Sequence, residues 1–173
     1  MMRHERPLGR ASLFALLLLL AATMAGGCAV QVGVAPELMG KSVEVNLVGI
    51  PPQDYQKWYE KSMTEYWKPG DPFRTEAIRE GYAFVMEFGQ GKAGTKSLRG
   101  DQAVWKKWQE VNARYLFVLA NLGPGADKAG WMDFRREIVR MRPWPILGPV
   151  IEARIKPSGV RLSNVPDRKL PKE

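Results

Sequence analysis

Apolar and polar residues alternate in several short segments of the chain, which is the period of a strand with one buried face. Residues 114–122 are apolar almost without a break, and this favours a central strand buried on both faces. Arginines on both faces of residues 134–141 indicate an edge strand, where charge discourages aggregation. Pro157-Ser158-Gly159 predicts the turn of a hairpin. The pattern predicts about six strands, at residues 41–50, 82–88, 114–122, 134–141, 150–156 and 160–162.

Two further segments have the period of a helix. In residues 54–63, the side chains of Tyr55, Trp58 and Tyr59 fall on one face, and residues 101–111 have a similar pattern around Trp108. Adjacent antiparallel strands can pair without crossover helices. The sequence therefore predicts a mainly β fold, a small antiparallel β-sandwich over residues 41–163 with two short helical insertions.

Tyr66 and Trp67 lie just before the turn Lys68–Pro72, which has two prolines and a glycine. Two interpretations are open for this aromatic pair. The rings pack onto the sheet from a loop, or they form an exposed anchor for a protein partner, because aromatic residues often carry interface energy. Under the second interpretation, Tyr66 and Trp67 are the candidate partner-binding residues.

The N-terminus has the three parts of an export signal. Arginines at 3, 6 and 10 precede an uncharged, Leu-rich run over residues 11–24, and small residues lead to Cys28. This ending resembles a bacterial lipoprotein signal, so residues 1–27 are expected to be removed and Cys28 to carry acyl chains. Two alternatives remain. Ala25 stands where lipoproteins usually have leucine, and Ala25 and Gly27 also suit ordinary signal peptidase, which would leave Cys28 as a plain N-terminal thiol. An uncleaved anchor would have an apolar part of about fifteen residues, fewer than the roughly twenty that span a bilayer.

Several acyl chains anchor a protein stably, whereas a single chain binds a membrane only marginally. Ala29 follows Cys28, where an Asp would favour retention at the inner membrane in many Gram-negative bacteria. The expected location is therefore the periplasmic face of the outer membrane. Residues 28–40 are expected to form the lipidated N-terminus and a spacer, and residues 164–173 a disordered tail.

Composition excludes most catalytic chemistry. The only histidine, His4, lies in the signal, and the only cysteine is Cys28, so the mature domain cannot build a Ser–His–Asp, Cys–His or His-ligated zinc site. No spacing of the acidic residues selects a hydrolytic carboxylate pair. Loss of three arginines and one glutamate with the signal leaves 23 basic and 17 acidic residues, a net charge of +6. This charge is diffuse, which argues against nucleic-acid binding. We expect no enzyme activity, cofactor, metal or small-molecule substrate.

The order of these segments resembles the outer-membrane lipoproteins of type VI secretion systems, the TssJ-like lipoproteins. A cysteine leads into the alternating strand Val43-Glu44-Val45-Asn46-Leu47, and an aromatic-rich connection follows over residues 52–80. The strand 82–88, the apolar strand 114–122 and a final hairpin complete the match.

The resemblance implies a transthyretin-like β-sandwich that acts as a structural component of a secretion membrane complex. It also implies a tether between a large inner-membrane subunit and the outer membrane, with partner contact through the connection at about residues 51–80. The alternative is a generic envelope lipoprotein that binds cell wall or another envelope ligand.

Overall fold

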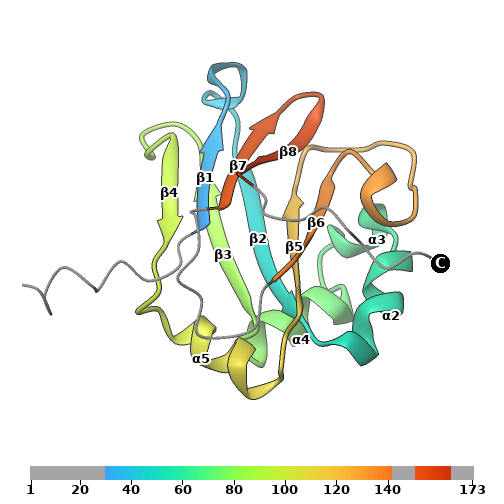
Figure 1. The fold of residues 1–173 in the computed structure, drawn as a ribbon. Helices are drawn as coiled ribbons and strands as arrows, with labels where there is room; N and C mark the ends of the chain where they lie inside the picture. The colour runs from blue at the N-terminus through green and yellow to red at the C-terminus, as the bar shows by residue number, and fades with distance from the viewer. Residues whose placement is uncertain (1–29, 142–150, 165–173) are drawn as a thin grey trace, which may run out of the picture.

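The computed structural model describes residues 30–141 and 151–164; the signal segment, Cys28 and the remaining residues lie outside the description. The described residues form two four-stranded sheets (Figure 1). Sheet A has the order β4 (Thr95–Leu98), β1 (Val30–Val34), β7 (Ile151–Lys156) and β8 (Gly159–Ser163). Sheet B has the order β3 (Ala83–Phe88), β2 (Val43–Ile50), β5 (Tyr115–Ala120) and β6 (Arg136–Arg140).

The two sheets pack face to face, so the predicted β-sandwich is confirmed. Alternate residues of β1, β2, β5 and β7 point into one shared core, among them Val32, Val45, Val118 and Ile155, each without measurable exposure. All neighbouring strands are antiparallel except β1 and β7, whose register pairs Val32 with Ala153 in parallel. The sandwich is therefore mixed rather than wholly antiparallel.

Helices cover the second face of sheet B. The connection between β2 and β3 folds into η2 (Pro52–Asp54), α2 (Tyr55–Glu60), α3 (Met63–Tyr66) and α4 (Pro72–Arg79). Trp58, Met63 and Ala77 from these helices bury Val48 and Phe117 on the outer side of the sheet. This second core explains why every residue of β5 is buried, as its continuous apolarity predicts.

Side-chain caps set the starts of the two later helices. The Ser62 side chain accepts a hydrogen bond from the Glu65 amide at 3.0 Å and begins α3. The Asp71 carboxylate accepts one from the Arg74 amide at 3.0 Å, and Pro72 takes the first position of α4. The sequence pattern indicated α2 but not α4, because the turn residues 67–72 obscured the start of that helix.

Helix α5 (Ala103–Glu110) closes one end of the sandwich. Trp105 and Trp108 are buried in the main core, as their spacing predicts, with ring centroids 4.8 Å apart. The Trp108 indole donates a hydrogen bond to the Tyr82 carbonyl at 2.7 Å, which ties α5 to the start of β3. The same ring lies against Gly49, where a Cβ atom would be 2.4 Å from the indole.

Replacing Gly49 by alanine is therefore expected to lower the free energy of unfolding by about 1–3 kcal/mol, because the added methyl must displace a buried indole. Urea denaturation measures this change. Gly40→Ala is the matched control, since nothing lies within 4 Å of its Cβ position. Equal midpoints for the two variants would show that Trp108 does not pack as described.

Two features of chain organisation differ from the expectation. Residues 30–34, expected to belong to a spacer, form β1 and pair on both sides within sheet A. The alternation of Val30, Val32 and Val34 is the signal that was missed. Strand β4 was not predicted, because only Leu98 of its four residues is apolar. Of the expected disordered tail, only Asn164 lies within the described residues. The described part of the chain contains no helix long and apolar enough to span a bilayer.

Candidate partner-binding surface

Tyr66 does not form an exposed anchor. It lies at the end of α3 and has no measurable exposure, so the prediction that it binds a partner is wrong. Its hydroxyl accepts a hydrogen bond from the Asn46 side chain of β2 at 3.0 Å. Burial raises the pKa of the Tyr66 hydroxyl above its ordinary value. The alternative interpretation, an aromatic ring packed onto the sheet, describes this residue.

Trp67 is half-buried beside it. Its ring meets Tyr66 edge-on with centroids 5.0 Å apart, and the Arg74 guanidinium lies 5.6 Å from the Trp67 ring centroid. Arg74 in turn donates hydrogen bonds to both carboxylate oxygens of Glu44, each at 2.7 Å. The indole Nε1 of Trp67 is buried without a hydrogen-bond partner among the described residues. Trp67 therefore serves mainly to seal α3 and α4 against sheet B.

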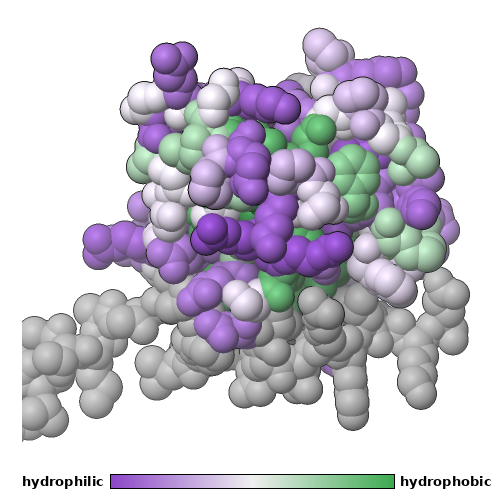
Figure 2. Space-filling view, turned by 90° about the horizontal axis from the view of Figure 1, so that it is seen from above, coloured by the Kyte–Doolittle hydropathy of each residue, from purple (hydrophilic) through white to green (hydrophobic). Residues whose placement is uncertain are grey.

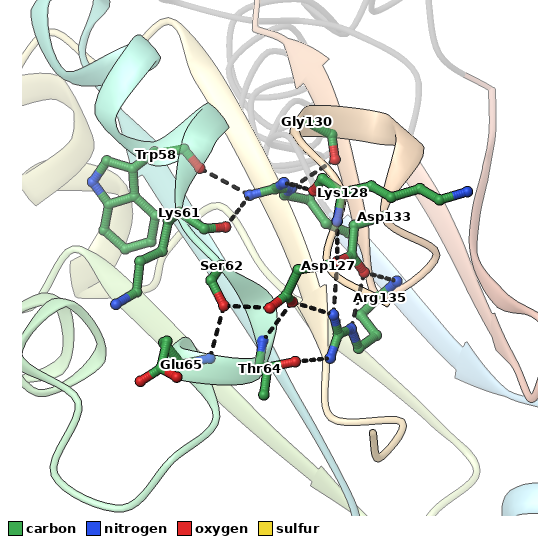
Figure 3. A network of polar contacts seen from close by, with 11 residues as sticks. Trp58, Lys61, Ser62, Thr64, Glu65, Asp127, Lys128, Gly130, Asp133 and Arg135 are labelled. Carbon is green, nitrogen blue, oxygen red and sulfur yellow. Dashed lines mark hydrogen bonds and ion pairs between the residues drawn. The ribbon is translucent and has the colours of Figure 1, made fainter. Parts of the chain in front are cut away.

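Two arginines, Arg135 just before β6 and Arg136 at its start, make the most extensive polar contacts among the described residues. Arg135 is buried and donates from Nε and Nη2 to the two carboxylate oxygens of Asp133, at 2.9 and 2.8 Å. It also donates to Asp127 at 2.6 Å and to the Thr64 hydroxyl at 3.1 Å (Figure 3). Burial alone would raise the pKa of Asp133, but the hydrogen bonds from Arg135 hold that pKa below its usual range.

Arg136 is also buried, and it binds four backbone carbonyl groups. Its guanidinium donates to Gly130 at 2.7 Å and Lys128 at 2.9 Å, and to Trp58 at 2.9 Å and Lys61 at 3.0 Å. Burial lowers the pKa of Arg136 to about 10. The side chain thereby joins the end of α2 to the turn before β6. The prediction that β6 is an edge strand is confirmed. Arg135 and Arg136 are buried, however, so they are not the exposed charges that were expected to discourage aggregation at this edge.

The turn held by these arginines carries two exposed apolar side chains. Trp131 and Met132 lie on η3 (Gly130–Met132) and are 57% and 50% exposed. Gly130 has φ +54°, and a Cβ atom there would be 1.9 Å from the Tyr59 ring, so the turn sits directly on α2. We call Trp131 and Met132 the η3 surface. Tryptophan and methionine are enriched at protein interfaces, and a rigid turn loses little entropy on binding.

The η3 surface is not among the residues predicted to bind a partner. Its signal was an apolar pair, Trp131-Met132, within a Gly-rich and polar segment over residues 123–133. Figure 2 shows the molecule from above the view of Figure 1. This end is mostly hydrophilic, and its hydrophobic areas are small and separate. Ile78 on α4 and Val85 on β3 are also exposed, at 41% and 36%, but each stands on a single element without a comparable network.

A cavity of about 290 Å³ lies between η2, α4 and α5. Asp54, Glu76 and Glu80 line it, together with Trp58 and Tyr82. Burial and these three carboxylates raise the pKa of the Tyr82 hydroxyl to about 12. Among the described residues, no group of three or more acidic, histidine or cysteine side chains is arranged to hold a metal ion.

Cys28, the expected lipid site, lies outside the described residues, two positions before β1.

No family model matches the sequence, and no curated protein matches it. Among solved structures, the fold is similar to the T6SS lipoprotein TssJ1 from Pseudomonas aeruginosa, with a TM-score of 0.44 and 9% identity over 81% of this chain and 96% of that one. It is also similar to Serratia marcescens Lip, a membrane-bound component of the type VI secretion system, with a TM-score of 0.40 and 11% identity. That likeness covers 82% of this chain and 99% of the other.

Proposed function

We propose that this protein is a lipid-anchored component of a type VI secretion membrane complex, held at the periplasmic face of the outer membrane. One observation carries the proposal. The only cysteine of the chain ends a lipoprotein-like signal and stands two residues before the first strand of a β-sandwich. A sandwich directly behind a lipid site suits a structural tether, because force on the domain passes to the anchor along paired strands.

The proposed partner is the periplasmic part of a large inner-membrane subunit. The η3 surface is the best site for it, because Trp131 and Met132 are exposed on a turn that two buried arginines hold in place. The turn also rests on α2, which belongs to the connection that the resemblance links to partner contact. The role is mechanical, and we propose no catalytic step.

A generic envelope lipoprotein is the second candidate. The cavity of about 290 Å³ favours it, because its lining has aromatic walls at Trp58 and Tyr82 and three carboxylates against one lysine, Lys107, and so could hold a small cationic envelope ligand. Binding of cell-wall fragments without recovery of any secretion subunit would support this candidate over the first.

Replacing Trp131 and Met132 together by alanine is expected to weaken partner binding by ~2 kcal/mol or more, roughly thirtyfold in Kd, because exposed aromatic anchors dominate interface energy. Cross-linking in cells followed by recovery of the tagged full chain measures the bound inner-membrane subunit. Ile78→Ala on α4 is the control, since it removes an exposed apolar side chain elsewhere. Undiminished recovery with the double variant would place the interface on another surface.

A further inference from the structure

Strand β1, the first described element after Cys28, and the helical layer lie in different layers of the described fold, with sheet B between them. The layers are sheet A, sheet B and then helices α2 to α4, which pack on the outer face of sheet B. Strand β1 belongs to sheet A, where it lies between β4 and β7. Packed sheets are about 10 Å apart, and a helical layer adds a similar depth. The outer face of sheet A and the helices are therefore separated by about 20 Å.

The chain between Cys28 and this sheet is too short to act as a flexible linker. Val30 is already paired with Leu98 of β4 and Ile151 of β7, so only Ala29 separates the lipid site from fixed structure. Two residues span at most about 7 Å. An acylated Cys28 would hold the start of β1 next to the lipid headgroups.

The outer face of sheet A suits an anionic lipid surface. Ala153, Ile155 and Val160 point into the core, so the alternate residues of β7 and β8 point outward. These outward residues include three exposed cations, Arg154, Lys156 and Arg161, and one exposed acid, Glu152. Arg154 and Arg161 stand directly opposite each other in the β7–β8 register.

The remaining polar contacts leave much of this positive charge available. Among the described residues Arg154 and Lys156 have no ion-pair partner, whereas Arg161 lies 3.8 Å from Glu137 of β6 and donates a hydrogen bond to the Val160 carbonyl at 3.2 Å. A shallow hollow of about 180 Å³, lined by Gly33, Arg154 and Ser163 among others, opens on the same face. Basic residues close to an anionic membrane surface are attracted to its headgroups.

We propose that the outer face of sheet A lies against the membrane, with Arg154, Lys156 and Arg161 on anionic phospholipid headgroups, and that the helical layer and the η3 surface point away from the bilayer. This inference rests on the lipid attachment in the proposed function. It adds an orientation, which leaves α2, α3 and η3 open to a partner that approaches from the periplasm.

Two single-cysteine labels test the orientation. Acylation would occupy the thiol of Cys28, the only cysteine in the chain, so Ser97→Cys or Thr75→Cys would introduce the only free thiol. Ser97 pairs with Gln31 on the outer face of sheet A, and Thr75 is exposed on α4 in the helical layer. The acylated full-length mature protein is placed in phosphatidylglycerol vesicles that contain a headgroup-linked quencher. Quenching at Ser97 is expected to be at least about threefold stronger than at Thr75, given the roughly 20 Å between the layers.

Charge variants test the headgroup contacts in the same assay. Arg154→Gln, Lys156→Gln and Arg161→Gln together are expected to reduce quenching at Ser97 at least about twofold. The control removes three exposed cations elsewhere, with Lys68→Gln, Arg79→Gln and Lys106→Gln, and is expected to leave it unchanged. Equal quenching at the two labels, stronger quenching at Thr75, or equal effects of the two triple variants would overturn the inference. A chain that mass measurement shows to be unacylated would instead reject the proposed function.

Discussion

Replacing Arg136 by methionine is expected to lower the free energy of unfolding by about 3–5 kcal/mol. Methionine fills much of the same volume but donates no hydrogen bond, so the carbonyl groups of Trp58, Lys61, Lys128 and Gly130 lose the donor that they share. Each buried carbonyl without a partner costs about 1–3 kcal/mol, and local rearrangement or water recovers part of the sum.

Urea denaturation of the full chain measures this loss. Arg140→Met is the matched control, because Arg140 lies on the same strand and is exposed, so its replacement is expected to change stability by no more than about 0.5 kcal/mol. If both variants unfolded at the same urea concentration, Arg136 could not be joining α2 to η3. Loss of the contact between α2 and η3 is also expected to weaken partner binding through the η3 surface. Trp131→Ala is expected to weaken the same binding without lowering the stability of the fold.

Replacing Arg135 by methionine is expected to cost a similar ~3–5 kcal/mol at neutral pH, because Asp133 would remain as a buried carboxylate without its cation. The double variant with Asp133→Asn is expected to recover part of the loss, since a neutral amide is cheaper to bury than an unpaired charge. Failure of the double variant to recover any stability would show that Arg135 acts through Asp127 and Thr64 alone.

The free energy of unfolding is expected to depend on pH differently in the parent protein and in the Arg135→Met variant. In the parent protein the pKa of Asp133 is lowered on folding, so its contribution is present above the unfolded pKa of about 3.9 and is lost as pH falls through the folded pKa. Without Arg135 the remaining burial would raise the pKa of Asp133, and stability would then fall as pH rises above about 4. Between about pH 4 and 7 Asp133 therefore leaves the stability of the parent nearly constant, whereas the stability of the Arg135→Met variant falls as pH rises. Denaturation curves over this range distinguish the two proteins.

The order of apolar and polar residues was enough to predict the strands whose buried faces or flanking turns leave a clear local signal. Strand β5 was predicted as central because both its faces are apolar, and the β7–β8 hairpin followed from its Pro-Ser-Gly turn. The pattern failed where a strand is short or polar. Only Leu98 gives β4 an apolar position, and β1 alternates over just five residues, with Gly33 at one outward position and Pro36 soon after it.

The candidate site depended on contacts that no local pattern contains. The buried position of Tyr66 follows from Asn46, twenty positions earlier in the chain. Arg135 and Arg136 look like surface charges in sequence, because the groups that satisfy them come from residues 58 to 64 and 127 to 133. Trp131 could not be assigned to the surface until the turn that exposes it was known.

The tether, the orientation and the proposed complex all depend on the acylation of Cys28, so its acylation state is the decisive measurement. Growth with a labelled fatty-acid analogue, followed by mass measurement of the N-terminal peptide, decides the matter. We expect a labelled protein whose mature chain begins at Cys28 with acyl chains attached, and loss of the label in Cys28→Ala. An unlabelled protein with a free thiol at Cys28, or a chain that retains residues 1–27, would contradict it.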